Sequence, residues 1–324
     1  MSAIQLPTHA PSPNCQDRYF QAIEDQRMRS STFLATDEIA VIRDSFRSGP
    51  VEYVQTGKGL LNAEMFSVRS PAVEIREVSF QAGTLLTCES VFPRFAMGVA
   101  LAGSPSLMGS KLTGSSLGFL NGRNGLVARH AAGSAWCNIA IDHQFLRDTA
   151  DLHGYSLPDG DGACALPNDV IARFAGTLSG IAHGSLGTEL DDRVFEEDIA
   201  LRVLQVLNLG QARERQSSAG QWRTSRLVIE YIHAHYHEPI TLSDLCRYSG
   251  VGERTLRYHF RKACDLSIQD YLMDYRLQRA YALLARGRVS TVGDVARSCG
   301  IPDAGRFAQY FRRHFGILPR TLLE

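Results

Sequence analysis

The sequence lacks the features of a membrane or exported protein. In its 324 residues, no window reaches the roughly 18 uninterrupted apolar residues that a membrane helix needs. The first residues, MSAIQLPTHAPSPNCQDRYF, have neither the basic start nor the apolar core of a signal peptide. The seven cysteines are scattered and include no C-x-x-C pair, which favours reduced thiols over a disulfide framework. We therefore expect a cytoplasmic protein without membrane contact.

Motifs of catalysis and metal binding are also missing. No P-loop, G-x-S-x-G or Rossmann glycine pattern occurs, and the cysteines are too dispersed for a zinc-thiolate cluster beside a reactive thiol. His130 and His143 stand alone, without the His-x-His…Glu…His pattern of metal-bearing cupin enzymes. His233 and His237 lie one helical turn apart but have no evident third ligand. We expect no enzyme, no cofactor and no metal, and a fused enzyme-regulator is the least favoured alternative.

Net charge is absent from the whole chain but not from its parts. From Trp222 to the end there are 16 Lys and Arg against 10 Asp and Glu, a balance of +6. The residues before Trp222 carry 18 against 24, a balance of −6. A basic C-terminal third behind an acidic body predicts that only this third meets a polyanion.

The pattern of apolar residues changes along the chain. From about 51 to 141, short alternating runs such as AVEIREVSFQAG, separated by Gly, Ser and Asn, predict a β-rich sandwich or barrel of cupin-like form. Helical patterns occupy about 168–209, and only helical patterns follow the polar stretch GQARERQSSAGQ. This order predicts an α+β fold class with a second, all-α domain. The expected divisions are a flexible arm (1–16), a regulatory and dimerisation domain (17–209), a linker (210–221) and a C-terminal domain (222–324).

An internal repeat lies in the C-terminal third. TLSDLCRYSGV (241–251) and TVGDVARSCGI (291–301) align at an offset of 50, each with a Thr-x-x-Asp capping box and a closing glycine. The segments TLRYHFRKACDLS and RFAQYFRRHFGIL align at an offset of 51. Each pair reads as a helix-turn-helix unit, about 241–263 and 291–314, and a long helix at about 268–286 joins them.

The second helix of the first unit has two distinct faces. In GERTLRYHFRKAC, helical periodicity places Arg254, Arg257, Tyr258 and Arg261 on one face, and Leu256, Phe260 and Ala263 on the other. A single basic face of this kind is usually a solvated surface. Because a second copy follows 50 residues later, the pattern favours contact with nucleic acid.

Residues 222–324 resemble the DNA-binding domain of the AraC/XylS family of bacterial transcription regulators. The segments YIHAHYHEPITLSDLCRYSGVGERTLRYHFRKAC and DVARSCGIPDAGRFAQYFRRHFGIL carry the resemblance. It implies a sequence-specific regulator of transcription that places two recognition helices in successive major grooves of double-stranded DNA. It also implies contact with RNA polymerase, an activator role, and a homodimer that associates through the helices at 168–209. Those helices could equally pack on their own β-domain.

The resemblance assigns the residues that contact DNA. In the first recognition helix the base-facing positions fall on Arg254, Arg257 and Tyr258. In the second they fall on Gly305, Ala308 and Gln309, so only Gln309 and the neighbouring Arg306 are equipped to read bases. The expected phosphate contacts are Arg261, Lys262, Arg312 and Arg313.

The β-rich region has two open interpretations. It is a structural domain in a regulator controlled by dimerisation or protein partners, or it holds a small-molecule effector in an apolar interior with a few polar groups. The resemblance favours the effector. The candidate pocket residues are Phe92, Arg94, Phe95, Phe119, Arg129 and Trp136.

Overall fold

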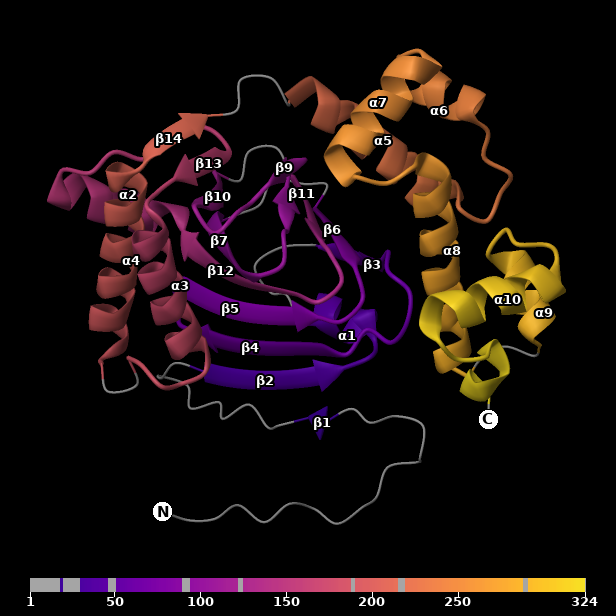
Figure 1. Ribbon diagram of the computed structural model, residues 1–324, viewed down its shortest axis with the longest axis horizontal. Coiled ribbons are helices and arrows are strands. Elements are labelled where there is room, and N and C mark those ends of the chain that lie inside the picture. Colours follow the sequence, from indigo (N-terminus) through magenta and orange to yellow (C-terminus); the bar gives the residue numbers. More distant parts are fainter. Residues whose placement is uncertain are drawn as a thin grey trace, which may run out of the picture.

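The computed structural model describes residues 18–19, 30–45, 51–88, 94–121, 125–187, 190–214, 219–287 and 291–323. The N-terminal part consists of two β-sheets with helices beside them, and the C-terminal part is helical (Figure 1). This arrangement confirms the α+β fold class and the two helix-turn-helix units joined by a long helix. No helix within these ranges is long and apolar enough to span a bilayer. The arm expected at 1–16 lies outside the described residues.

Both sheets are antiparallel throughout. The larger sheet, called sheet A, has nine strands in this spatial order: β1 (Arg18–Tyr19), β2 (Ser30–Thr36), β4 (Ala63–Arg69), β5 (Val73–Phe80), β12 (Ser134–Asp142), β7 (Arg94–Ala102), β10 (Ser116–Leu120), β13 (Gly162–Ala165) and β14 (Gln211–Glu214). The smaller one, called sheet B, has five: β3 (Glu52–Gln55), β6 (Thr84–Cys88), β11 (Leu126–His130), β8 (Ser106–Leu107) and β9 (Ser110–Lys111).

Alternate residues of the strands face different cores, as the period of two in an extended chain requires. On β12, Cys137 and Ile139 belong to the core that lies against helices, whereas Trp136 and Ala140 belong to the core that sheet A shares with sheet B. The residues of sheet B that share this core include Tyr53 of β3. The two sheets therefore form a sandwich, and its interior is the region where the sequence predicted a pocket.

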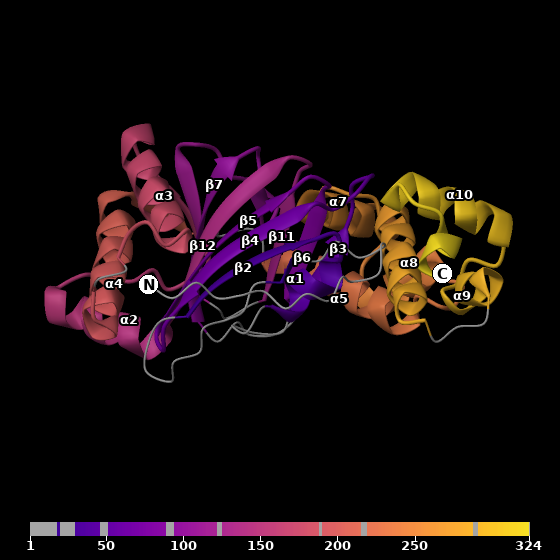
Figure 2. The ribbon, with the colours of Figure 1, turned by 90° about the horizontal axis from the view of Figure 1, so that it is seen from below.

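Helices cover the outer face of sheet A. They are α2 (His143–His153), α3 (Asn168–Ala182) and α4 (Asp192–Leu209), while the short α1 (Ile39–Asp44) lies near β3 (Figures 1 and 2). The apolar face of α4, with Phe195, Ile199 and Val203 buried, packs into the same core as the strands. Of the two interpretations of these acidic helices, packing on their own β-domain accounts for this face.

The polar stretch at 210–221 is not simply a linker. β14 pairs with β13 as the last strand of sheet A, and α5 (Ala219–His235) begins before the stretch ends. A strand at a sheet edge is held by backbone hydrogen bonds, which polar composition does not reveal. Gly210, just before β14, lets the chain lie close to β13, because a Cβ at this position would lie 1.9 Å from the buried thiol of Cys164.

The C-terminal part is a pair of helix-turn-helix units on a shared long helix. The remaining elements are α6 (Leu242–Ser249), α7 (Glu253–Cys264), α8 (Ile268–Ala285), α9 (Val292–Ser298), α10 (Ala304–Phe315) and a 3₁₀ turn, η1 (Pro319–Leu322). The first unit consists of α6 and α7, the second consists of α9 and α10, and α8 joins them. Thr241 and Thr291 cap α6 and α9 by accepting hydrogen bonds from the backbone N–H of Asp244 and Asp294.

Candidate nucleic-acid interface

The first recognition helix, α7, presents a basic exposed face. Leu256 and Phe260 are fully buried and anchor the helix, while Arg254, Arg257 and Tyr258 are exposed. Tyr258 keeps 59% of its surface in solvent. The periodicity in the sequence therefore gives the same two faces as the structure.

The charged side chains of α7 differ between its two ends. In the first turn Arg257 Nε donates to Glu253 Oε1 over 2.9 Å. In the last turn Arg261 and Lys262 are exposed. Exposed ion pairs of the Arg257–Glu253 kind contribute little to stability, so the Arg257 side chain is able to exchange this partner for another acceptor at low cost.

The second recognition helix, α10, is anchored in the same way, but its exposed face has fewer side chains that can contact bases. Phe307 and Phe311 are fully buried, and Gln309 is exposed. Asp303 caps the helix by accepting from the backbone N–H of Arg306. At the base-facing positions Gly305 has no side chain and Ala308 is half-buried. Arg306, Arg312 and Arg313 supply the exposed positive charge.

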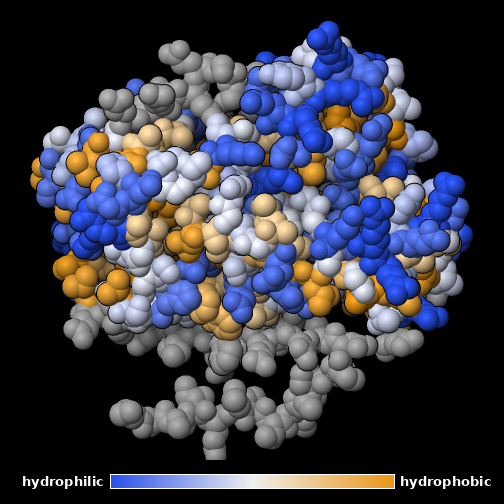
Figure 3. All heavy atoms as spheres, in the orientation of Figure 1, coloured by the Kyte–Doolittle hydropathy of each residue, from blue (hydrophilic) through white to orange (hydrophobic). Residues whose placement is uncertain are grey.

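The long helix α8 joins the two units. Its first half, with Ile268, Tyr271 and Tyr275, is part of the apolar cluster of the first unit. Its second half, with Leu277 and Leu284, is part of the cluster of the second. In the space-filling view, hydrophilic side chains gather over the region that α5, α6, α7, α9 and α10 occupy in Figure 1 (Figure 3).

Comparison with known proteins identifies this arrangement. A family described as "Helix-turn-helix domain" matches residues 245–324. The HTH-type transcriptional activator RhaR of Yersinia pseudotuberculosis is 37% identical over 79 residues, which are 24% of this chain and 27% of the relative. The probable thc operon regulatory protein of Rhodococcus erythropolis is 30% identical over 96 residues, which are 29% of each chain. The chain thus spans less than a third of the length of these curated relatives.

A solved structure covers the same region. It is a probable AraC family transcriptional regulator from Rhodopseudomonas palustris, 35% identical, and the match covers 31% of this chain and 94% of the other with a TM-score of 0.30. This chain carries an AraC-family DNA-binding domain. The family model and the curated relatives match the helical C-terminal third, which holds α7 and α10.

The exposed surface of the AraC-family domain includes residues that sequence reasoning did not select. Thr255 is exposed between Arg254 and Leu256, and Tyr310 follows Gln309 with 37% of its surface in solvent. Tyr248 of α6 is half exposed against the ring of Tyr231. Helical periodicity applied to α6 also places Tyr248 on an exposed face.

Most of the residues predicted for an effector pocket lie elsewhere. Phe95 and Phe119 pack on each other in the core beneath the helices, because odd-numbered positions of β7 and β10 face that side. Arg94, the first residue of β7, donates to the backbone carbonyls of Pro71 and Ala72, which precede β5. Arg129 forms an ion pair with Asp265 at the end of α7. Phe92 lies outside the described residues. Of the five that the structure describes, Trp136 alone lines the cavity described next.

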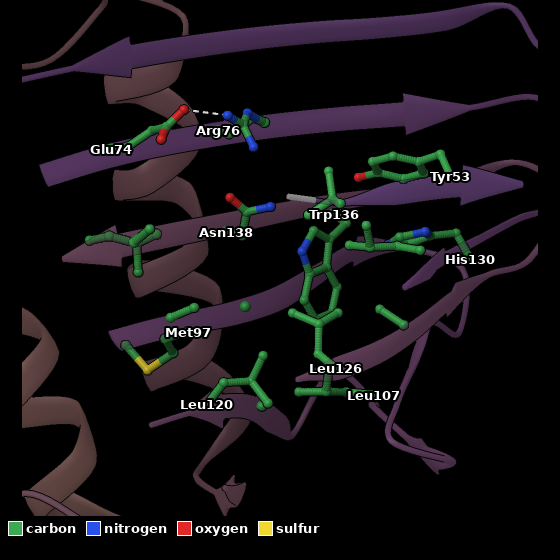
Figure 4. A pocket seen from close by; sticks show the side chains of 18 residues that line it. Tyr53, Glu74, Arg76, Met97, Leu107, Leu120, Leu126, His130, Trp136 and Asn138 are labelled. Carbon is green, nitrogen blue, oxygen red and sulfur yellow. Dashed lines mark hydrogen bonds and ion pairs between the residues drawn. The ribbon is translucent and has the colours of Figure 1, made fainter. Parts of the chain in front are cut away.

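A cavity of about 60 Å³ lies between the two sheets of the sandwich (Figure 4). Trp136 lies flat against β7, where a Cβ on Gly98 would come within 1.8 Å of the indole. Burial lowers the pKa of the lining His130 to about 4, so this imidazole is neutral at pH 7. The other lining residues comprise polar Tyr53, Glu74, Arg76 and Asn138, and apolar or small Val51, Leu86, Ala96, Met97, Gly98, Leu107, Gly118, Leu120, Leu126, Ala128, Ile139 and Ala140.

A buried ion pair forms one end of this cavity. Glu74 and Arg76, adjacent inward positions of β5, are 3% and 2% exposed and bonded to each other. Arg69 of β4 donates to the same carboxylate over 2.7 Å. Buried charges of this kind persist only where partners hold them, and they provide fixed groups that a polar ligand can meet.

Proposed function

We propose that this chain is a sequence-specific transcription regulator that places α7 and α10 in successive major grooves of double-stranded DNA. The observation that supports this most directly is the pair of exposed basic helix faces carried on α8. With 18 residues, α8 is about 27 Å long. This length is close to the ~34 Å between successive major grooves on one side of the duplex.

The residue types suit different roles at the DNA surface. Arg254 and Arg257 can each donate two hydrogen bonds to guanine, and Gln309 can do so to adenine. Arg306 and Tyr258 are the remaining base-facing candidates. Arg261, Lys262, Arg312 and Arg313 stand toward the far ends of the two helices, where backbone phosphates are the nearer partners.

The proposed mode of regulation follows from the names of the relatives. Because RhaR is named a transcriptional activator, we propose activation here too, through contact with RNA polymerase in the cytoplasm. The regulatory part extends through β14, and the DNA-binding part begins with α5.

Removal of two arginines tests DNA binding. Duplexes recovered with the purified chain and sequenced supply the binding site. Arg254→Ala combined with Arg257→Ala should weaken binding to this site by about 30-fold or more, because each base-reading arginine contributes ~1–3 kcal/mol. The matched control, Arg147→Ala with Arg173→Ala, removes two exposed arginines from α2 and α3. Wild-type affinity in the first variant would rule out this face as the reader.

We further propose that the inter-sheet cavity binds a small effector. Its combination of a stacked indole, a neutral imidazole and a buried ion pair is the mixture of apolar lining and few polar groups that ligand sites show. A space of this volume holds a few water molecules, so the ligand has only a few non-hydrogen atoms there. Mass spectrometry of molecules released from the purified chain tests this. Recovery of none, together with no thermal shift from metabolite pools, supports the ligand-independent alternative.

A homodimer is the proposed assembly. Leu186, Leu190 and Val194, at and before the start of α4, are 48%, 39% and 51% exposed, which leaves an apolar surface beside the helix's buried face. Sedimentation of the unmodified chain and of Val194→Asp measures the fraction of dimer in each, and Val194→Asp should lower it. A dimer that Val194→Asp does not weaken would place the contact elsewhere.

A further inference from the structure

The edge of sheet B is covered by a side chain of the AraC-family domain. β3 is the outermost strand of sheet B, so its outward backbone groups need partners. Gln278 of α8 supplies both: its Nε2 donates to the carbonyl of Tyr53 over 2.5 Å, and its Oε1 accepts from the N–H of Gln55 over 2.9 Å. One amide thus takes the place that a peptide group of a neighbouring strand would occupy.

The second recognition helix reaches the same strand. His314 of α10 is buried, and its Nε2 lies 3.1 Å from the carbonyl oxygen of Gln55. The carbonyl of His314 accepts from the N–H of Gly59 over 2.8 Å. The side chain of Gln55 in turn donates to the carbonyls of Gly57 and Gly59, which fixes the loop that His314 contacts. β3 is therefore bonded to both α8 and α10.

The first recognition helix packs on the outer face of sheet B. Val54, Leu85 and Val127 point outward from the sheet and are buried in one apolar cluster with Leu256 and Phe260 of α7. In both ribbon views α7 lies beside β11, and α8 lies beside β3 (Figures 1 and 2). The outer face of sheet B is thus part of the core of the first helix-turn-helix unit. This packing fixes the unit relative to β3.

Polar contacts fix the C-terminal end of α7. Arg129 Nη1 lies 2.6 Å from Oδ2 of Asp265, the residue that closes α7. The turn between β8 and β9 sits against the carbonyl of Lys262, and a Cβ on Gly109 would lie 2.2 Å from that oxygen. Both recognition helices are thus held at their C-terminal ends, and their N-terminal turns with Arg254 and Arg306 stay exposed.

We propose that sheet B sets the geometry between the two recognition helices, with Gln278 as the positioning residue that binds the edge of β3. In this arrangement the N-terminal part determines which spacing of two half-sites the protein accepts, although Gln278 itself faces β3 and not DNA. The inference rests on the proposed DNA binding, because half-site spacing has meaning only for a protein that reads both half-sites.

Duplexes with altered spacing test the proposal in the full-length chain. One base pair is inserted or deleted between the two half-sites of the recovered binding site. We expect the unmodified chain to lose roughly tenfold or more in affinity, the size of one mismatched pair. Gln278→Ala should reduce this loss to less than about threefold, because the half-sites can then be met independently. Gln269→Ala, an exposed glutamine of the same helix, should behave as wild type. An unchanged spacing profile in Gln278→Ala would overturn the proposal.

A second measurement, made without DNA, tests the contact between Gln278 and β3, called the clamp, independently of the proposed function. Hydrogen exchange of the peptide that contains Gln55 should be slow in the unmodified chain and at least tenfold faster in Gln278→Ala. Gln278→Glu, which keeps the accepting oxygen for Gln55 and loses the donor to Tyr53, serves if the alanine variant does not fold. Equal exchange in wild type and variant would overturn the clamp. Failure of the unmodified chain to bind any duplex would overturn the proposed function, and the exchange result would still decide whether Gln278 holds β3.

Discussion

Tyr53 and Gln278 join the inter-sheet cavity to the DNA-binding helices. The ring of Tyr53 lines the cavity, and its carbonyl oxygen accepts the hydrogen bond from Gln278 Nε2 over 2.5 Å. No third residue intervenes between the cavity and α8. A ligand that shifts Tyr53 therefore changes the clamp directly, provided that it binds the clamped and released states with different affinity.

Gly109 provides a test of the contact between sheet B and α7. In Gly109→Ala the new methyl group meets the Lys262 carbonyl, so the β8–β9 turn must move away from α7. Gly133→Ala is the matched control, since Gly133 has a similar positive φ (+69° against +77°) with no atom within 4 Å of the added Cβ. Both changes incur the ~1–2 kcal/mol of a left-handed alanine. We expect urea unfolding to show a further loss of about 1–2 kcal/mol for Gly109→Ala alone. Equal losses would contradict the contact.

The two recognition helices should differ in sequence discrimination. α7 presents Arg254, Arg257 and Tyr258, whereas α10 has Gly305 and a half-buried Ala308 at the matching positions. We expect Arg257→Ala to relax base preference under α7 by about 1–3 kcal/mol, and Gln309→Ala to have a smaller effect under α10. Binding to a library of single-base operator variants measures both. Equal relaxation at the two half-sites would show that the faces are equally selective.

The sequence predicted the C-terminal helices far better than the contacts of sheet B. Repeated capping boxes, glycines and apolar spacings are local signals, and they indicated two helix-turn-helix units joined by a long helix. The partners of Arg129 and Gln278 lie 136 and 225 residues away in the chain, and no local pattern encodes such pairs.

The residues predicted for the effector pocket illustrate a second limit of prediction from sequence. Phe95, Phe119 and Trp136 were grouped by chemistry, yet strand alternation sends the two phenylalanines to the helix-facing core and the tryptophan to the cavity. Once the register of β7, β10 and β12 is known, parity alone separates them. The sequence indicates the alternation within each strand, but it does not indicate which face meets the second sheet.

Gly252 offers a stabilising change in α7. It is the N-cap, with φ −71° and ψ 159°, a conformation that serine adopts readily, and a Cβ there has open space. Gly252→Ser should raise the free energy of unfolding by about 0.5–1 kcal/mol, from the cap hydrogen bond and the lower entropy of the unfolded chain. Gly114→Ser, in an open turn outside any helix, reports the entropic part alone. Thermal unfolding that ranks the two variants equally would argue against a cap.

The buried pair at the end of the cavity predicts a large loss of stability. Glu74→Ala leaves the buried guanidinium of Arg76 without this carboxylate and should lower the free energy of unfolding by about 3–5 kcal/mol. Glu74→Leu with Arg76→Met removes both charges and should cost clearly less. Glu64→Ala, exposed on β4, is the control in denaturant titrations. A double variant as unstable as Glu74→Ala would indicate that packing, and not charge, holds this site.

Asp274 and His314 predict a dependence of stability on pH. His314 Nδ1 lies 3.4 Å from Asp274 Oδ1. Burial, with a contribution from Asp270, raises the pKa of Asp274 to about 8, and burial lowers the pKa of His314 to about 4 although its bond to Gln55 favours the charged form and opposes this shift. At pH 7 both groups are then neutral, so a protonated Asp274 is able to donate to Nδ1 while Nε2–H donates to Gln55.

Below pH 6.5 the two groups change the free energy of unfolding in opposite directions as the pH rises. Above pH 6.5 only Asp274 changes it. An acid whose folded pKa is raised favours folding fully below its ordinary pKa, and this contribution falls as pH rises toward about 8. A histidine whose folded pKa is lowered costs stability only as pH falls below about 6.5. Between pH 6.5 and 8, Asp274 therefore dominates, and the protein should lose stability in this window. Asp274→Asn, which keeps a donor for Nδ1 and carries no charge, should abolish the loss in urea titrations, while Asp198→Asn on the exposed side of α4 should retain it. Parallel profiles for wild type and Asp274→Asn would mean that Asp274 is already ionised in the folded protein at pH 6.5, so that its carboxylate accepts a hydrogen bond and donates none to His314.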